Sequence, residues 1–368
     1  MALSKVDLAN QVENQLPQNL VANNLPFRNI IINGDMSIAQ RGTSFTGLGN
    51  GGSAYTVDRF KWTEEGTITN EWTITQDTDV PTGQGFATSL KVDCTTADAS
   101  LDANSIQYLE QRVEGQNLQY LKYGTANAES LTLSFWVKSN KTGTYTINLV
   151  NTDAATRYSS QTYTISASNT WEKKTLVFSG DTSSGFDNDN GNSFTVQINL
   201  AAGTNKSSGS PQTWNTSVEA NRAPGQVNLA DDTANEWFIT GVQLEAGTTA
   251  SDFEFLPVDV NLARCQRYFE KMLPEAMIMV RYSGSTSFGN AGNFKVTKRA
   301  TPSLSRENGT ATINAYDGDG TGGSPVASAW SLNSINVIGF SLAATTPTSP
   351  DQFFMGIGSD HFLIDSEL

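Results

Sequence analysis

Strand-like alternation of apolar and polar residues dominates residues 28–256. In the segment LTLSFWVK, Leu131, Leu133 and Phe135 alternate with polar neighbours, which is the period of two expected of a half-buried strand. The same pattern recurs in GTYTINLV, SFTVQINL, TLVFSG and EWFITGVQLEAG, and clusters of Gly, Asn, Ser and Asp separate the runs. About ten such runs without a long helix between them predict an antiparallel β sandwich.

The period changes from two to about three and a half at residues 257–273. The apolar residues that share one helical stripe there are Val258, Leu262, Cys265, Phe269 and Met272. We expect a helical linker at residues 257–275, which Pro274 terminates. The stripe either packs on the sandwich or lies beside identical copies at an oligomer axis.

Two further segments flank these elements. Residues 276–368 return to short strand-like runs separated by Gly-rich loops, and they predict a smaller C-terminal β domain. Residues 1–27 are rich in Asn and Gln, and their apolar residues are thinly spaced. This segment is predicted to be an extended N-terminal arm that becomes ordered on a partner, or else a frayed terminus.

The composition narrows the classes of function. The chain has 23 basic and 37 acidic residues, a net charge of −14, and only 16% charged residues. Without a cluster of basic residues, we expect no binding to nucleic acid. No apolar run is long enough for a membrane span, and the first 25 residues lack the pattern of a signal peptide.

Cysteine and histidine limit the available chemistry. Cys94 and Cys265 lie in segments of different type and are predicted to be free thiols. His361 is the only histidine, so a Ser-His-Asp triad or a multi-histidine zinc site is not expected. The sequence contains no recognised catalytic motif, and a pair of glycosidase carboxylates is the remaining enzymatic alternative. We therefore predict that the protein is not an enzyme and needs no cofactor.

Several segments resemble the tail fibres and other receptor-binding virion proteins of tailed bacteriophages. The opening RNIIINGDMSIAQRGTSF and YTVDRFKW resemble the start of a sandwich domain common in that family, and GVQLEAGTTASDFEFLPVDVNLARCQRYFEK resembles its end. FKVTKRATPSL and the final IDSEL resemble the closing β domain. The resemblance implies a jelly roll like that of carbohydrate-binding modules, followed by a short helix and a smaller β domain.

The resemblance also implies partners and a location. We expect a structural virion protein, made in the host cytoplasm and assembled as a homo-oligomer, often a trimer. Residues 1–27 would attach it to other tail or neck proteins, and it would contact a glycan or protein of the host surface. The alternatives are a structural or decoration protein of capsid, neck or tail that binds no receptor, and a polysaccharide depolymerase.

Two tryptophans are candidate sugar platforms, because a pyranose ring stacks on a flat apolar face. Trp136 faces away from the core side of its strand, and Trp214 lies in the polar loop TNKSSGSPQTWNTS. Alternatively, Trp136 is covered by a loop or a neighbouring subunit, and Trp214 anchors its own loop.

Carbohydrate-binding jelly rolls often hold a structural calcium ion, and the resemblance therefore draws attention to three aspartates. Asp35 lies in the segment INGDMS, near the start of the domain, and Asp231 and Asp232 lie late in it. Ser37 stands about where those modules place an acidic ligand, which weakens the expectation of a Ca²⁺ site.

Overall fold

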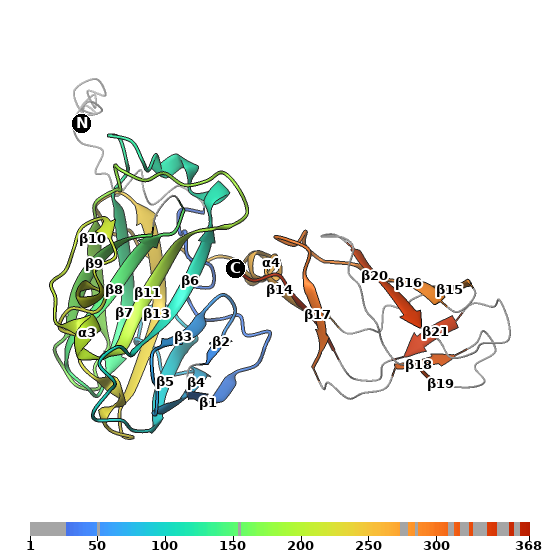
Figure 1. Ribbon diagram of the computed structural model, residues 1–368, viewed down its shortest axis with the longest axis horizontal. Coiled ribbons are helices and arrows are strands. Elements are labelled where there is room, and N and C mark those ends of the chain that lie inside the picture. Colours follow the sequence, from blue (N-terminus) through green and yellow to red (C-terminus); the bar gives the residue numbers. More distant parts are fainter. Residues whose placement is uncertain are drawn as a thin grey trace, which may run out of the picture. The chain divides into compact units, whose positions relative to one another are not determined.

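The computed structural model describes residues 27–49, 52–153, 156–272, 279–283, 286–307, 313–316, 324–326, 337–343, 353–356 and 361–368. The chain forms two compact units, whose elements are labelled in Figure 1. The first comprises Met1–Ser37, Thr43–Thr56 and Phe60–Leu256, and the second comprises Ile38–Gly42, Val57–Arg59 and Pro257–Leu368. The predicted arm, residues 1–27, lies outside the described residues except for Phe27.

The first unit is built from two antiparallel sheets. Sheet A has the order β1-β4-β5-β13-β7-β10, and its strands in that order are Ser44–Gly49, Glu71–Asp77, Ser89–Thr96, Glu236–Ala246, Leu131–Ser139 and Glu172–Phe178. Sheet B has the order β12-β9-β8-β11-β6-β3-β2, and its strands are Asn215–Thr216, Arg157–Ile165, Gly143–Asn151, Asn192–Ala202, Ile106–Glu114, Lys61–Glu65 and Ser53–Tyr55. Strands distant in sequence are neighbours, so the unit has the predicted antiparallel jelly-roll layout.

The core lies between the two sheets and is made by alternate residues of each strand. Leu133 and Phe135 of β7 are at most 1% exposed, and Ile147 of β8 is fully buried. Trp62 of β3 and Trp72 of β4 meet with their ring centroids 5.4 Å apart, although they belong to different sheets. Full burial of each large apolar side chain contributes about 1.5–3 kcal/mol, so this alternation accounts for the sandwich.

Gly34, in the INGD segment, makes a close approach to β13. The backbone N–H of Val242 donates to the carbonyl oxygen of Gly34 over 2.9 Å, where the β13–β7 register shifts between Thr240 and Gln243. A Cβ atom on Gly34 would lie 2.0 Å from the carbonyl oxygen of Val242. Because no side chain fits there, glycine lets this segment pack against the bulged strand.

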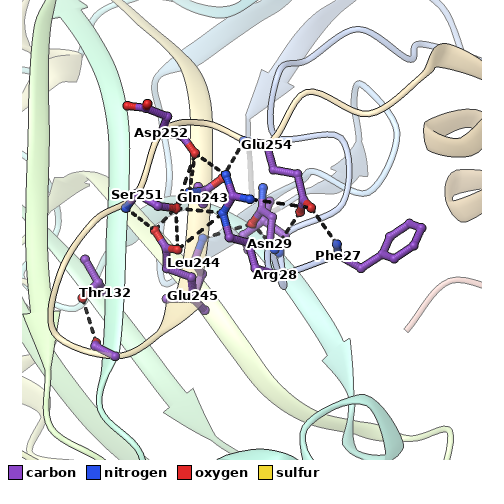
Figure 2. A network of polar contacts seen from close by, with 12 residues as sticks. Phe27, Arg28, Asn29, Thr132, Gln243, Leu244, Glu245, Ser251, Asp252 and Glu254 are labelled. Atoms are coloured by element: carbon purple, nitrogen blue, oxygen red, sulfur yellow. Dashed lines mark hydrogen bonds and ion pairs between the residues drawn. The ribbon is translucent and has the colours of Figure 1, made fainter. Parts of the chain in front are cut away.

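A buried polar network fixes the described start of the chain against the segment that follows β13 (Figure 2). Arg28 Nε donates to Ser251 Oγ over 2.8 Å, and Ser251 Oγ donates to a Glu245 carboxylate oxygen over 2.6 Å. The two oxygens of Glu254 accept the backbone N–H groups of Phe27 and Asn29. We call this set of six residues the entry network, since it holds the chain where residue 27 joins the sandwich.

Helix α4 of the second unit, Val258–Gln266, is shorter than the helical linker predicted at residues 257–275. The chain leaves the helix well before Pro274, and Phe269–Met272 forms strand β14. Strand β22, Phe362–Asp365, pairs with β14 on one side and with β17, Ser303–Arg306, on the other. Over the described residues up to 272, the predicted linker is therefore not one continuous helix, because the C-terminal strand supplies pairing that the local sequence does not reveal.

The rest of the second unit is an antiparallel sheet, as expected of a smaller β domain. Its order is β19-β18-β21-β15-β16-β20. The strands in that order are Ser324–Val326, Ile313–Tyr316, Phe353–Gly356, Met279–Ser283, Thr286–Asn293 and Val337–Ala343.

Two short segments from early in the chain belong to the second unit and bring cations to its C-terminal end. Arg41 and Arg59 both pair with the carboxylate of Glu367. The guanidinium of Arg41 lies 3.6 Å from the ring centroid of Phe269, and that of Arg59 lies 3.5 Å from the ring centroid of Tyr268. We call these five residues the closing cluster. It unites the AQRG, VDRF, RYFEK and IDSEL segments that carry the sequence resemblance.

Both cysteines are buried free thiols, as predicted. Burial raises the pKa of Cys94 to about 11, with a smaller contribution from Asp93 and the neighbouring aspartates. A helix with the length and apolar character of a membrane span is not found among the described residues.

Candidate functional site

The outer face of sheet B carries a concentration of polar side chains that the sandwich core does not use. On β6, Leu109 is fully buried and lies in register with Trp62 of the core, so Tyr108 and Glu110 lie on the opposite face. The neighbouring strands add side chains to the same face by their register. We call this set the polar face; its members are Lys61, Glu65, Tyr108, Glu110, Arg112, Asn148, Tyr158, Gln197 and Asn199.

Two cations lie over a buried carboxylate at one end of the polar face. Lys61 is directly opposite Glu110 in the β3–β6 register, and its Nζ lies 3.9 Å from Glu110 Oε1. The same oxygen accepts from Arg112 over 2.8 Å and from Thr63 Oγ1 over 3.2 Å. Burial and the positive charge of Arg112 lower the pKa of Lys61, although Glu110 opposes the shift.

A second ion pair, between Arg222 and Glu65, lies at the other side of the polar face. Arg222 forms two parallel hydrogen bonds to Glu65, of 2.6 and 2.7 Å, and Tyr108 Oη donates to Glu65 over 2.8 Å. Burial alone would raise the pKa of Glu65, but the hydrogen bonds and charge of Arg222 outweigh it and hold that pKa below its usual value. The guanidinium of Arg222 also lies 5.6 Å from the ring centroid of Tyr158.

Unsatisfied amide oxygens lie between these charged groups. Gln197 is 5% exposed, and in register it stands between Glu110 and Asn148. Its Oε1 atom accepts no hydrogen bond from the described residues, and neither do the Oδ1 atoms of Asn148 and Asn199. A buried acceptor without a donor costs about 1–3 kcal/mol. Hydroxyl or N–H donors of a ligand, or water, would remove that cost.

Residues 203–227 cover part of the polar face. Their carbonyl groups hold the two asparagine amides, since Asn148 and Asn199 both donate from Nδ2 to the backbone oxygen of Arg222. An apolar contact beneath this segment joins Ala223 to Ile106, Tyr108 and Ala202. Because the Nδ2 group of each asparagine donates to this segment, the Oδ1 atom of each is directed elsewhere and lacks a donor.

Trp136 lies on the outer face of sheet A, on the opposite side of the sandwich from the polar face. It is half-buried, and the register places it between Lys173 of β10 and Thr240 of β13. Close by along the same face, Lys138 Nζ lies 4.0 Å from the ring centroid of Phe238. The structure brings Trp136 to the surface position that the alternation predicts, and its role as a sugar platform stays a prediction.

Trp214 packs into an aromatic group that its local sequence does not reveal. Its ring centroid lies 5.7 Å from that of Tyr123 and 6.3 Å from that of Phe194. Its indole N–H donates to the carbonyl oxygen of Ser179 over 2.6 Å. These contacts fit the alternative in which Trp214 anchors its own loop, and a sugar-binding role for its remaining exposed surface stays a prediction.

The three candidate calcium ligands do not come together. The backbone oxygen of Asp35 accepts from Thr240 Oγ1, whereas Asp231 bonds Asn235 and pairs with Lys141. Asn235 directly precedes β13, and Thr240 lies five residues further along the extended chain, a step of about 16 Å. Asp232 caps a turn by accepting the N–H of Ala234. No group of three or more acidic, His or Cys side chains suited to a metal occurs in the described part of the chain.

Sequence reasoning did not identify the polar face. Its residues are the outward-facing polar residues of strands that were recognised from their inward-facing apolar residues. Outward-facing polar residues on a strand are ordinarily exposed to solvent. The local signal was the unusual bulk and charge of YLEQR in β6, where Tyr108, Glu110 and Arg112 occupy alternate positions. The cross-strand register that collects them was not visible.

Comparison with solved structures finds matches of distant sequence. The enzymatically active domain of tailspike protein 4 from bacteriophage CBA120 aligns with a TM-score of 0.32 and 16% identity, over 60% of this chain and 22% of that chain. A family 11 carbohydrate-binding module from Clostridium thermocellum, in complex with a β-1,3-1,4-mixed-linked tetrasaccharide, aligns with a TM-score of 0.29 and 10% identity, over 55% of this chain and 98% of that chain. No family model and no curated protein matches the sequence. The likeness is too distant to assign a function.

Proposed function

We propose that this protein is a structural virion protein of a tailed bacteriophage, a tail fibre that binds a glycan of the host surface through the polar face. The resemblance of its opening, linking and closing segments to phage tail fibres supports the virion role. The observation that carries the binding role is the buried, unsatisfied amide oxygen of Gln197, flanked by charged groups and by half-buried Tyr158.

Sugar recognition needs the groups that this face offers. Sugar hydroxyls donate to amide and carboxylate oxygens and accept from cationic donors, and an aromatic ring packs on the C–H side of a pyranose. Gln197 provides an acceptor, Lys61 and Arg112 provide donors, and Tyr158 provides a ring. Because strands hold these groups in fixed register, little conformational entropy is lost on binding.

We propose that the protein binds the glycan without cleaving it. Glycoside hydrolysis requires one carboxylic acid that stays protonated to donate to the leaving group. On the polar face Arg222 keeps Glu65 ionised, and a carboxylate oxygen of Glu110 already accepts from Arg112 and Thr63. These contacts favour carboxylates that position cations over carboxylates that transfer protons.

A homotrimer suits this function. Single glycan sites bind weakly, and several sites on one particle engage together, so avidity exceeds the single-site affinity by about 10²–10⁴. We propose residues 1–27 as the attachment to tail or neck proteins. Immunogold labelling of intact particles tests the location: label at the tail supports the fibre, and label over the capsid supports a decoration protein instead.

Binding of bacterial surface polysaccharides tests the site. For Tyr158→Ala and Gln197→Leu we expect about tenfold weaker binding of any polysaccharide that the wild type binds, since each loses about 1.4 kcal/mol of contact. Tyr120→Ala is the matched control, because Tyr120 is a 51% exposed tyrosine that does not lie on the polar face. Equal binding by all variants, with their folds intact, contradicts the site.

A further inference from the structure

Two cationic side chains of the polar face reach solvent at its Lys61 end. The side chains of Lys61 and Arg112 are 19% and 30% exposed, whereas Glu110 beneath them is 2% exposed. One buried carboxylate is therefore shared between two cations that reach the surface. Both cations reach solvent on a chain whose net charge is −14.

Lys61 is poorly paired within the described residues. Its ion pair with Glu110 spans 3.9 Å, which is too long for a hydrogen bond, while Arg112 reaches the same carboxylate oxygen at 2.8 Å. Arg112 and burial both act against the ammonium form of Lys61, so its pKa lies below the usual lysine value. An additional carboxylate beside Lys61 would stabilise that ammonium and reduce its repulsion with Arg112.

We propose that the polar face selects acidic glycans, and that the carboxylate of a uronate-type sugar lies between Lys61 and Arg112. The inference rests on the proposed function, because it assigns a ligand class to the same site. Gln197, whose buried side-chain oxygen lacks a donor, is directly opposite Glu110 in the β11–β6 register and so lies next to this position. The half-buried ring of Tyr55, whose centroid lies 5.8 Å from Lys61 Nζ, borders the site.

The selection is local and not a consequence of overall charge. The net negative charge of the chain repels an acidic polysaccharide at long range, and the ion pair at Lys61 acts only at contact distance. A neutral polysaccharide meets neither effect. Removing the sugar carboxylates changes both effects, but in opposite directions. Loss of the general repulsion strengthens binding, whereas loss of the specific contact weakens it.

The experiment uses the full-length protein and a panel of bacterial surface polysaccharides, each tested in its native form and after chemical reduction of its carboxyl groups. For the polysaccharides that bind, we expect carboxyl reduction to weaken wild-type binding about tenfold, as expected for loss of one charge-assisted contact. Lys61→Met is expected to bring the native and reduced forms within about twofold of each other. Lys122→Met is the matched control, since Lys122 is an exposed lysine that pairs with Glu129 and does not lie on the polar face, and it should retain the wild-type ratio.

The possible results distinguish this inference from the proposed function. Binding that is unchanged or strengthened by carboxyl reduction overturns the acidic-glycan inference and leaves glycan binding intact. A tenfold ratio that persists in Lys61→Met also overturns it, because the selection then resides elsewhere. Absence of binding to every member of the panel, native or reduced, contradicts the proposed function itself.

Discussion

At the scale of single residues, Glu65 helps to hold residues 203–227 over the polar face, because it binds Arg222 of that segment. Its folded-state pKa is below the usual value, because Arg222 and Tyr108 bond the ionised form. Such a group contributes stability above its unfolded pKa, and that contribution is lost as pH falls through the folded pKa. We therefore expect the Glu65 contribution to be present at pH 7 and to be lost progressively as pH falls below the ordinary glutamate pKa of about 4.3 and through the lower folded pKa.

Urea unfolding of wild type and Glu65→Gln between pH 3 and pH 7 measures this contribution. At pH 7 the variant should be less stable by under about 1 kcal/mol, since the Glu65 side chain is 38% exposed and solvent screens its ion pair. The two proteins should converge at low pH. A difference that stays constant across this range would show that the ionisation of Glu65 does not matter.

Element-scale stability depends on the entry network as well as on the core. Arg28 is the cation of this network, and the carboxylates of Glu245 and Glu254 beside it are only 4% and 8% exposed. Removing one partner of a buried ion pair strands the other charge. For Arg28→Met we expect a loss of about 3 kcal/mol in the free energy of unfolding of the first unit.

Tryptophan fluorescence during urea unfolding measures this loss, because six of the seven tryptophans lie between Phe60 and Leu256. Lys122→Met is the control: Lys122 pairs with Glu129 over 2.8 Å on the exposed surface and should cost less than about 1 kcal/mol. Similar losses in the two variants would show that burial of the carboxylates is not the reason.

Elements with a complete local signal were predictable, and elements that depend on distant partners were not. The alternation in β7 or β11 specifies both the strand and its buried side, so the sandwich followed from the sequence. The stripe through Phe269 has helical spacing, yet it forms β14 because Phe362–Asp365 pairs with it. Trp214 stands among polar neighbours in sequence, and only the fold brings Tyr123 and Phe194 to its ring. The polar face likewise requires cross-strand register.

At the scale of the whole molecule, the closing cluster makes the second unit depend on segments from both ends of the chain. Ile38–Gly42 and Val57–Arg59 supply Arg41 and Arg59, and the C-terminal residues supply Glu367. Glu367 is 4% exposed and Arg59 is 1% exposed, so this ion pair is shielded from solvent. A chain cut between the sandwich and helix α4 therefore separates charged side chains from their buried partners.

Glu367→Gln tests this dependence, because it keeps the shape of the side chain and removes the charge that Arg41 and Arg59 share. We expect the second unit to lose about 3 kcal/mol of stability, as for other buried ion pairs that lose one partner. Hydrogen exchange of the backbone amides in β14 measures the effect, since these strand residues belong to the second unit. Glu307→Gln is the control. The Glu307 side chain is 36% exposed and pairs with Lys271, so loss of this ion pair should change hydrogen exchange little. Equal protection of β14 in wild type and Glu367→Gln would mean that β22 pairing, and not the closing cluster, holds the unit together.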